Sequence, residues 1–274
     1  SEKQRKKLTK ILIKNGLDLI IFSGLPNYSF EWLMQFHSAN VKTGIIFHGG
    51  LAEFNDNSKK QDNFKKIIQF SKNSVINRIG IVKKGLDDWL ELATNSKINR
   101  VLPALNLPTD LKIIKRKDGK THIGVFANST YNKNRHSQIA AASLIENSVI
   151  HILEPNEFDY ILPKCRVKIH NNLSRRDFLE LLGSMDVNLY CSYSESWGQV
   201  ILESMALNVP CVYSNNSGIS ELIESDQCMV QDYDNITAIT NKIKSLLDVD
   251  FSLKFNEKLY SKRVRELNSE MIEI

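Results

Sequence analysis

The sequence has no long apolar run, and this absence argues against a membrane-spanning protein. Apolar stretches such as residues 19–22 reach four residues, whereas a membrane helix needs about 18 or more. Residues 1–7 are highly charged and lead into an amphipathic pattern without the apolar centre of a secretory signal. We therefore expect a cytoplasmic protein without a leader or membrane-spanning segment.

Cysteine is scarce and shows no spacing typical of a zinc site or a disulfide framework. The four cysteines, Cys165, Cys191, Cys211 and Cys228, include no C-x-x-C pair. Cys191 and Cys211 lie inside apolar runs that resemble strands. We therefore expect reduced core residues, as in a cytosolic protein.

Acidic residues are only slightly fewer than basic ones, 31 against 36, which leaves a net charge of +5. A mildly basic chain suits a phosphate-bearing ligand or an anionic surface. No aromatic and basic motif accompanies the charge, so nucleic acid is not an expected partner. Basic clusters at residues 3–10 and 112–120 are interpreted as a solvated helix face and a charged loop. The first also predicts peripheral contact with an anionic membrane.

From about residue 120, short apolar runs alternate with segments of helical periodicity. Strands are predicted at residues 121–127, 149–153, 166–170, 187–191 and 209–213. Helices are predicted at residues 135–146, 174–185, 199–207, 218–224 and 234–247. Ser174 and Asp177 form an N-cap pair for the second of these helices. This alternation predicts a parallel, doubly wound sheet, whose ligands bind at the carboxyl ends of the strands.

The first half of the sequence shows the same alternation less cleanly. Helices are predicted at residues 6–15, 30–36, 64–71 and 86–94, and strands at residues 17–22, 44–47, 78–82 and 101–104. Residues 105–120, with a proline and a run of lysines, have the composition of a linker. We predict an N-terminal domain at 1–110, a C-terminal domain at 111–250 and a helical tail at 251–274.

The most informative stretch is residues 192–206, where a polar loop follows a buried strand and leads into a helix. Glu195 lies in the loop, and Gly198 lets the backbone approach a ligand closely. The free amides at residues 198–200 would form an anion site of the kind that holds a phosphate. Glu203 points back from the helix toward the same ligand. The pattern predicts a ligand with a diphosphate and several hydroxyl groups.

Residues 192–223 resemble the donor-binding segment of the retaining glycosyltransferases of the group 1, glycogen-synthase-like family. The likeness rests on Glu195 and Glu203, the pair Trp197-Gly198, the run Leu202-Glu203-Ser204-Met205-Ala206, the run Asn208-Val209-Pro210, and Gly218 with Glu221. The resemblance implies an α/β fold of the GT-B type. Two Rossmann-like, doubly wound domains would face each other across a cleft, with the N-terminal domain reduced or truncated.

The resemblance also implies a nucleotide-diphospho-sugar donor held in the C-terminal domain. Glu203 would bond the ribose hydroxyls, and Glu195 would bond hydroxyls of the transferred sugar near the reacting carbon. The other donor-binding positions would be Trp197 and the amides of Gly198, Gln199 and Val200.

Two cations of the family neutralise the diphosphate, and only one has a counterpart at its expected position. The family places an arginine and a lysine, five residues apart, after the first strand of this domain. Lys133 stands at the lysine position, whereas Asn128 occupies the arginine position. Arg135 or Arg116 would then have to supply the second cation.

The first half contributes a candidate residue for the acceptor side. Residues 44–50 resemble the family's strand that ends in a histidine at the cleft. His48 is therefore a candidate for acceptor-side catalysis or positioning.

These features predict transfer of a hexosyl group, with retention, from a nucleotide sugar to a hydroxyl of a glycan, lipid-linked or protein acceptor. The catalytic candidates are Glu195, His48 and Lys133, and the role would lie in glycan or glycoconjugate biosynthesis. No metal or other cofactor is expected, because no D-x-D element of the sort that holds a metal in other transferases is identified. Two alternatives stay open: a non-catalytic, nucleotide-sugar-binding GT-B partner subunit, and a GT-B nucleotide-sugar epimerase.

Overall fold

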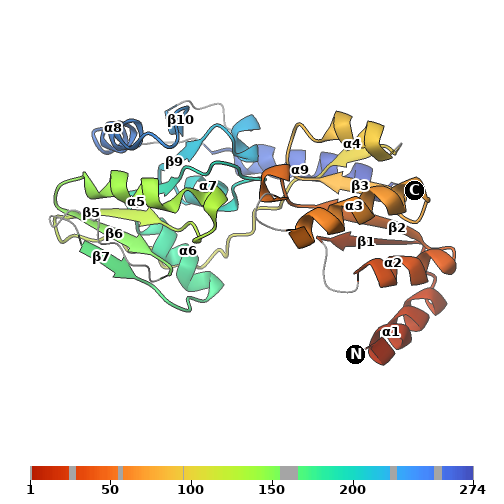
Figure 1. The fold of residues 1–274 in the computed structure, drawn as a ribbon. Coiled ribbons are helices and arrows are strands. Elements are labelled where there is room, and N and C mark those ends of the chain that lie inside the picture. Colours follow the sequence, from red (N-terminus) through yellow and green to blue (C-terminus); the bar gives the residue numbers. More distant parts are fainter. Residues whose placement is uncertain are drawn as a thin grey trace. The chain divides into compact units, whose positions relative to one another are not determined.

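The chain forms two compact α/β units, which we describe from a computed structural model (Figure 1). The structure describes residues 2–24, 29–54, 58–94, 96–154, 166–222, 227–249 and 255–273. Unit 1 comprises residues 1–103 and 261–274, and unit 2 comprises residues 104–260. Each unit has its own parallel sheet, which confirms the predicted fold class of two Rossmann-like units.

Unit 1 is built on a sheet of four parallel strands in the order β1-β2-β3-β4. The strands are β1 (Leu19–Ser23), β2 (Lys42–Phe47), β3 (Arg78–Ile81) and β4 (Ile98–Arg100). The helices are α1 (Glu2–Lys14), α2 (Ser29–Ser38), the 3-10 helix η1 (Leu51–Phe54), α3 (Ser58–Lys72) and α4 (Asp87–Thr94). Strand residues such as Ile45 and Ile79 pack with Leu33 and Leu90 of the helices in a buried core. This sheet holds fewer strands than that of unit 2.

The last strand of unit 1 lies three residues earlier than predicted, so the expectation of a strand at 101–104 is wrong. Val101 and Leu102 are buried, as their apolar character suggested, but they follow β4. The Leu102 amide donates to Asn268 Oδ1 at 2.8 Å, and the Leu102 carbonyl accepts from Asn268 Nδ2 at 3.0 Å. The side chain of Asn268 therefore bonds the Leu102 backbone where a neighbouring strand would otherwise do so.

Asn268 belongs to α9 (Glu257–Ile272), whose C-terminal part packs on unit 1. The Arg78 guanidinium donates to the Glu270 carbonyl at 3.2 Å, and Met271 is buried. The tail expected at 251–274 therefore includes a helix that belongs to a sheet unit. Residues 251–254 lie outside the described residues.

Unit 2 contains a sheet of six parallel strands in the order β10-β9-β8-β5-β6-β7. The strands are β5 (Thr121–Val125), β6 (Ser148–Ile152), β7 (Arg166–Ile169), β8 (Val187–Tyr190), β9 (Cys211–Ser214) and β10 (Met229–Val230). The chain proceeds from β5 toward one edge and from β8 toward the other. The strand order therefore reverses between β5 and β8, and ligands of such sheets bind outside the carboxyl ends at this point.

Helices cover both faces of the unit 2 sheet. Helix α5 (Arg135–Ser143) packs beside α8 (Ile236–Leu247), and α6 (Arg175–Gly183) packs beside α7 (Gln199–Ala206) (Figure 1). The predicted cap of α6 is confirmed, because the Ser174 hydroxyl accepts from the Asp177 amide at 3.1 Å. The helix predicted at 218–224 is instead the 3-10 helix η3 (Gly218–Glu221), and residues 223–224 lie outside the described residues.

The described cysteines are core residues, as expected. Cys191, Cys211 and Cys228 are buried, and none of them forms a disulfide. Cys165 lies outside the described residues. Within the described part of the chain, no helix combines the length and apolarity that a bilayer crossing requires.

Three histidines form a chain of hydrogen bonds across β5, β6 and the end of β7. Asp118 accepts from His122 Nε2 at 2.9 Å, which leaves His122 Nδ1 as an acceptor. His151 Nε2 donates to that atom at 2.9 Å, and His170 Nε2 donates to His151 Nδ1 at 2.8 Å. A neutral imidazole has one N–H group, so the chain is satisfied when all three rings are neutral.

The hydrogen-bonded row of three histidines predicts that the folded protein loses stability in acid. Burial, together with the charges of Arg116, His170, His122 and Lys168, lowers the pKa of His151 to about 3, against 6.5 in the unfolded chain. Between these pH values the unfolded chain binds a proton that the folded chain excludes. The contribution of His151 to the free energy of unfolding is therefore fully present above the unfolded pKa. It falls as the pH drops below that value, by at most about 1.4 kcal/mol per pH unit.

Nuclear magnetic resonance of the imidazole nitrogens checks this expectation. The His151 ring should stay neutral down to about pH 5. Urea unfolding should show lower stability at pH 5 than at pH 7. A His151 titration midpoint near pH 6 in the folded protein would contradict the prediction.

Candidate active site

Three loops meet at the carboxyl edge of the unit 2 sheet, where the strand order reverses. They follow β5 and β8, which flank the reversal, and β9, which is the neighbour of β8. The Tyr193 amide donates to the Asn132 carbonyl at 2.9 Å, and the Asn132 side chain donates to the Ser194 carbonyl at 3.1 Å. Asn216 from the third loop donates to the Tyr193 carbonyl at 3.1 Å. These bonds tie the loops that carry the predicted donor residues into one surface.

Lys133 and Glu195, predicted from separate parts of the sequence, form an ion pair at this edge. Lys133 ends the 3-10 helix η2 (Tyr131–Lys133), and Glu195 lies in the loop after β8. The two side chains are only 15% and 12% exposed, so the pair is partly shielded from water. Lys133 Nζ also lies 5.2 Å from the centre of the Tyr190 ring. Burial raises the pKa of Tyr190, and the Glu195 charge raises it further.

The N-terminus of α7 provides backbone donors in the same loop region. Gly198 is the N-cap residue, with φ of 96°, a conformation that disfavours side chains. A Cβ atom there would approach Ile201 Cδ1 to 2.6 Å. The first amides of a helix, here those of Gln199 and Val200, have no intrahelical acceptor. A helix N-terminus of this kind can hold an anion, and the phosphate-binding role of these amides stays a prediction.

Trp197, predicted to bind the donor, is a packing residue of the loop in this structure. Its side chain is buried, and its ring centre lies 6.3 Å from that of Tyr260. The Ile219 amide donates to the Trp197 carbonyl at 2.8 Å, which holds η3 against the loop. A Cβ atom on Gly218 would lie 2.2 Å from the Ser196 carbonyl oxygen, so glycine is needed for this close approach.

Glu203 is almost completely buried on α7 and accepts a bidentate interaction from Arg175 at the start of α6. Arg175 Nη1 lies 3.0 Å from Glu203 Oε2, and Nη2 bonds the other carboxylate oxygen. The side chains are 1% and 53% exposed for Glu203 and Arg175, respectively. The sequence prediction missed Arg175, because an arginine just after an N-cap serine is typical of a solvated helix end. No local pattern places it against Glu203.

Arg135 and Asn128 form hydrogen bonds with residues other than Lys133 and Glu195. Arg135 is buried, and its guanidinium donates to the carbonyl and carboxylate of Glu154, the carboxylate at 3.3 Å. Asn128 is exposed and accepts from the Thr130 amide at 3.2 Å within its own loop.

Arg116, the other arginine considered, is also engaged elsewhere, because it donates to the Ser184 hydroxyl at 3.1 Å. Among the described cations, Lys133 is thus the one paired with Glu195, and Arg175 is the one paired with Glu203.

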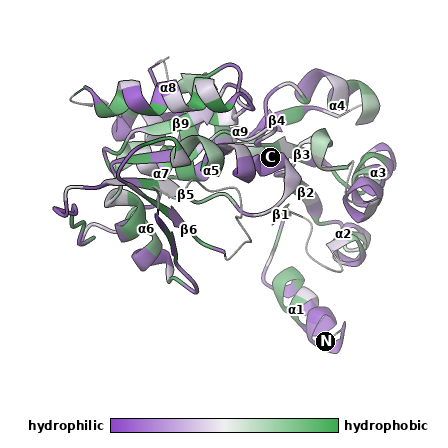
Figure 2. Ribbon diagram, turned by 60° about the vertical axis from the view of Figure 1, so that its left-hand side comes forward, coloured by the Kyte–Doolittle hydropathy of each residue, from purple (hydrophilic) through white to green (hydrophobic). Residues whose placement is uncertain are grey.

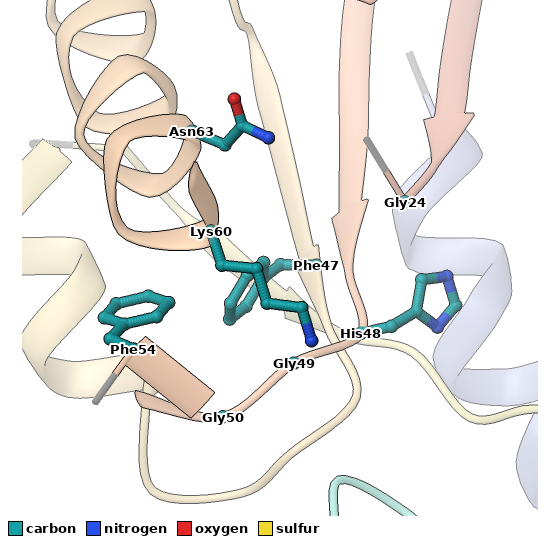
Figure 3. Close-up of a pocket in the computed structure, with 8 residues that line it drawn as sticks. All are labelled: Gly24, Phe47, His48, Gly49, Gly50, Phe54, Lys60 and Asn63. Carbon is teal, nitrogen blue, oxygen red and sulfur yellow. The ribbon is translucent and has the colours of Figure 1, made fainter. Parts of the chain in front are cut away.

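His48, the acceptor-side candidate, lines a cavity of about 330 Å³ in unit 1 (Figure 3). The other lining residues are Gly24, Phe47, Gly49, Gly50, Phe54, Lys60 and Asn63. His48 Nε2 lies 2.8 Å from the Ser23 hydroxyl, and burial lowers the His48 pKa. Figure 3 shows Lys60 reaching from α3 toward the Gly49 backbone. The cavity thus combines a neutral imidazole, a lysine and an aromatic wall.

Two Asp-x-Asp tripeptides occur in the sequence, at residues 232–234 and 248–250, contrary to the expectation of no such element. The first precedes α8. Its Asp232 carboxylate accepts from the Asn235 amide side chain at 2.8 Å, and Asn235 is the N-cap of α8. This tripeptide is therefore part of a helix-capping turn.

Two α/β units with parallel sheets, of which unit 2 is doubly wound with charged loops at its strand reversal, define a protein of the GT-B type. Residues 108–263 match the family described as "Glycosyl transferases group 1". Because the match spans more than half of the sequence, the chain belongs to the group 1 glycosyltransferase family. The family predicted from residues 192–223 is thereby confirmed. No curated protein sequence matches the chain.

Solved structures share the fold at low sequence identity. Sucrose-phosphate synthase from Thermosynechococcus elongatus aligns with a TM-score of 0.67 at 15% identity, over 97% of this chain and 73% of its own. Anabaena Alr3699/HepE, in complex with UDP and glucose, gives a TM-score of 0.68 at 15% identity, over 97% and 81%. A UDP-forming α,α-trehalose-phosphate synthase from Burkholderia xenovorans gives 0.61 at 11% identity, over 98% and 74%.

Proposed function

We propose that this glycosyltransferase moves a hexosyl group from a nucleotide-diphospho-sugar to a hydroxyl acceptor with retention and without a metal. The observation that carries the proposal is the shielded Lys133–Glu195 pair beside the N-terminus of α7. A cation and free backbone amides suit a diphosphate, and a carboxylate suits the hydroxyls of a sugar.

The donor would extend from Glu203 to the N-terminus of α7. A carboxylate has about four lone-pair positions, so Glu203 can accept from ribose hydroxyls while it holds Arg175. Lys133 and the amides of residues 198–200 would stabilise the charge that develops on the departing diphosphate. Glu195 would orient the transferred sugar.

In the proposed reaction, the bond between the anomeric carbon and the diphosphate oxygen breaks. The acceptor oxygen forms its bond to that carbon on the same face, and its proton passes to the departing diphosphate. The products are the glycosylated acceptor and a nucleoside diphosphate. The acceptor would be a glycan, a lipid-linked molecule or a protein, with His48 and its cavity on the acceptor side.

The names of the structural relatives suggest the first donors to test. One relative is a complex with UDP and glucose, and another is described as UDP-forming. We therefore place a uridine diphospho-sugar first, for a reaction in the cytoplasm. The asparagine at 128, where the family has an arginine, and the engagement of Arg135 by Glu154 favour one alternative, a non-catalytic partner subunit that binds the same donor.

Calorimetry of the full chain with UDP-, GDP-, ADP- and dTDP-sugars tests the proposal. We expect selective binding of one donor that is unchanged by a chelator. The protein is then incubated with the bound donor and simple glycoside acceptors. Nuclear magnetic resonance should show a product that keeps the donor's anomeric configuration.

The other outcomes each overturn part of the proposal. Binding without any transfer or hydrolysis would indicate the partner subunit. Conversion of the donor to a stereoisomer without an acceptor would indicate an epimerase. Transfer that stops when the chelator is added would overturn metal independence, and binding of no donor would overturn the donor site.

A further inference from the structure

Helix α1 of unit 1 carries a concentrated positive charge. Its residues include six basic side chains and one acidic side chain, a net charge of +5. This equals the net charge of the whole chain, so the remaining residues carry equal numbers of basic and acidic groups. Helix α1 is therefore one strongly basic surface of this protein, of the kind that attracts an anionic partner.

The lysines of α1 form a row on its exposed face. Lys3, Lys7, Lys10 and Lys14 follow one another at intervals of four, three and four residues, which places them on one side of a helix, and all four are exposed. Leu8 and Ile11 each follow one of these lysines, and they are 44% and 46% exposed. The row of lysines thus has two large apolar side chains along its border, and Figure 2 shows both hydrophilic and hydrophobic residues along α1.

The opposite face of α1 anchors it to unit 1, so this orientation is set by packing. Thr9 is buried, and its hydroxyl donates to Gln35 Oε1 of α2 at 3.4 Å. Leu12 and Ile13 pack against the core of unit 1. The helix lies beside α2 and away from the sheet (Figure 1). The lysines, Leu8 and Ile11 therefore face outward together.

Helix α3 shows that charge alone does not distinguish α1. It carries five lysines and one aspartate, a net charge of +4, over residues 58–72. None of its large apolar side chains is exposed. Helix α1 differs because exposed apolar side chains border its exposed lysines, so the lysines can reach anionic headgroups while Leu8 and Ile11 enter the apolar boundary of a membrane.

We propose that α1 binds the surface of a membrane rich in anionic phospholipid. The lysines would contact the phosphates of the headgroups, and Leu8 and Ile11 would enter the boundary with the acyl chains. The membrane contact involves no residue of the proposed donor site, so it can be tested independently of glycosyl transfer. It would hold the protein at the surface where a lipid-linked acceptor is found.

Co-sedimentation with lipid vesicles tests the proposal. The full chain should bind phosphatidylcholine vesicles that contain about 30% phosphatidylglycerol, and it should bind pure phosphatidylcholine vesicles at least about tenfold more weakly. The variant Lys3→Gln/Lys7→Gln/Lys10→Gln should lose at least about tenfold of its affinity for the anionic vesicles. High salt should weaken binding in the same way, because it screens the charges.

The matched control is Lys59→Gln/Lys65→Gln/Lys72→Gln on α3, which removes the same charge from another exposed helix surface. It should keep most of the vesicle binding, and circular dichroism should show that both variants are folded. Replacement of Leu8 and Ile11 by serine should also weaken binding. Equal losses in the α1 and α3 variants, or equal binding to neutral and anionic vesicles, would overturn the proposal.

Discussion

Replacing Glu195 by glutamine is expected to lower the rate of sugar transfer by about a hundredfold or more, with little change in affinity for the free nucleotide. Glutamine keeps the shape of the side chain but removes the charge that faces Lys133. The proposed role of Glu195 concerns the transferred sugar, which a free nucleotide lacks. Single-turnover transfer assays and calorimetry with the nucleoside diphosphate measure the two effects separately.

The control for this prediction is Glu180→Gln on α6, which removes a carboxylate paired with Arg176 away from the proposed site. It should transfer sugar at nearly the rate of the unmodified protein. If Glu195→Gln loses nucleotide binding together with transfer, then Glu195 has been assigned to the wrong part of the donor.

Replacing Glu203 by glutamine is expected to weaken binding of the free nucleoside diphosphate by about tenfold or more, because hydrogen bonds to a charged group each contribute about 1.5–3 kcal/mol. The proposed partners of Glu203 are the ribose hydroxyls, which the free nucleotide retains. Calorimetry with the nucleoside diphosphate measures this loss, and unchanged affinity would exclude the ribose role.

The variant Arg175→Gln separates the structural part of the Glu203 interaction from the part that binds the ligand. Arg175 is half exposed and can be hydrated alone, whereas Glu203 is 1% exposed and cannot. Loss of Arg175 should therefore destabilise unit 2 by about 2 kcal/mol in urea unfolding, because a buried charge is left unpaired. Glu203→Gln should cost less, and the double variant should recover part of the loss. Equal costs for both single variants would contradict this asymmetry.

Local sequence signals predicted much of the fold and the central elements of the site. Apolar residues at strand and helix periods placed most elements of both units within a few residues of their observed bounds. The loop with Glu195, the glycine at 198 and the helix of Glu203 were recognisable because each feature depends on residues close in the chain. Lys133 was placed by the resemblance to the family, whose lysine lies at this distance after the first strand of the domain.

The errors concern residues whose partners lie far away in the sequence. The strand expected at 101–104 was misplaced because Asn268, 166 residues from Leu102, satisfies the backbone there. Arg135 was assigned to the donor as a nearby cation, but the fold buries it against Glu154.

The sequence by itself determined the family, the alternation of strands and helices, and which loop carries the carboxylates. Only the tertiary structure decided that Lys133 pairs with Glu195 and that Arg175 closes on Glu203. The reason is physical. Periodicity encodes which side of an element is buried, whereas the meeting of two loops depends on the order of strands in the sheet. Here β5 and β8, separated by two other strands in the chain, are neighbours in space.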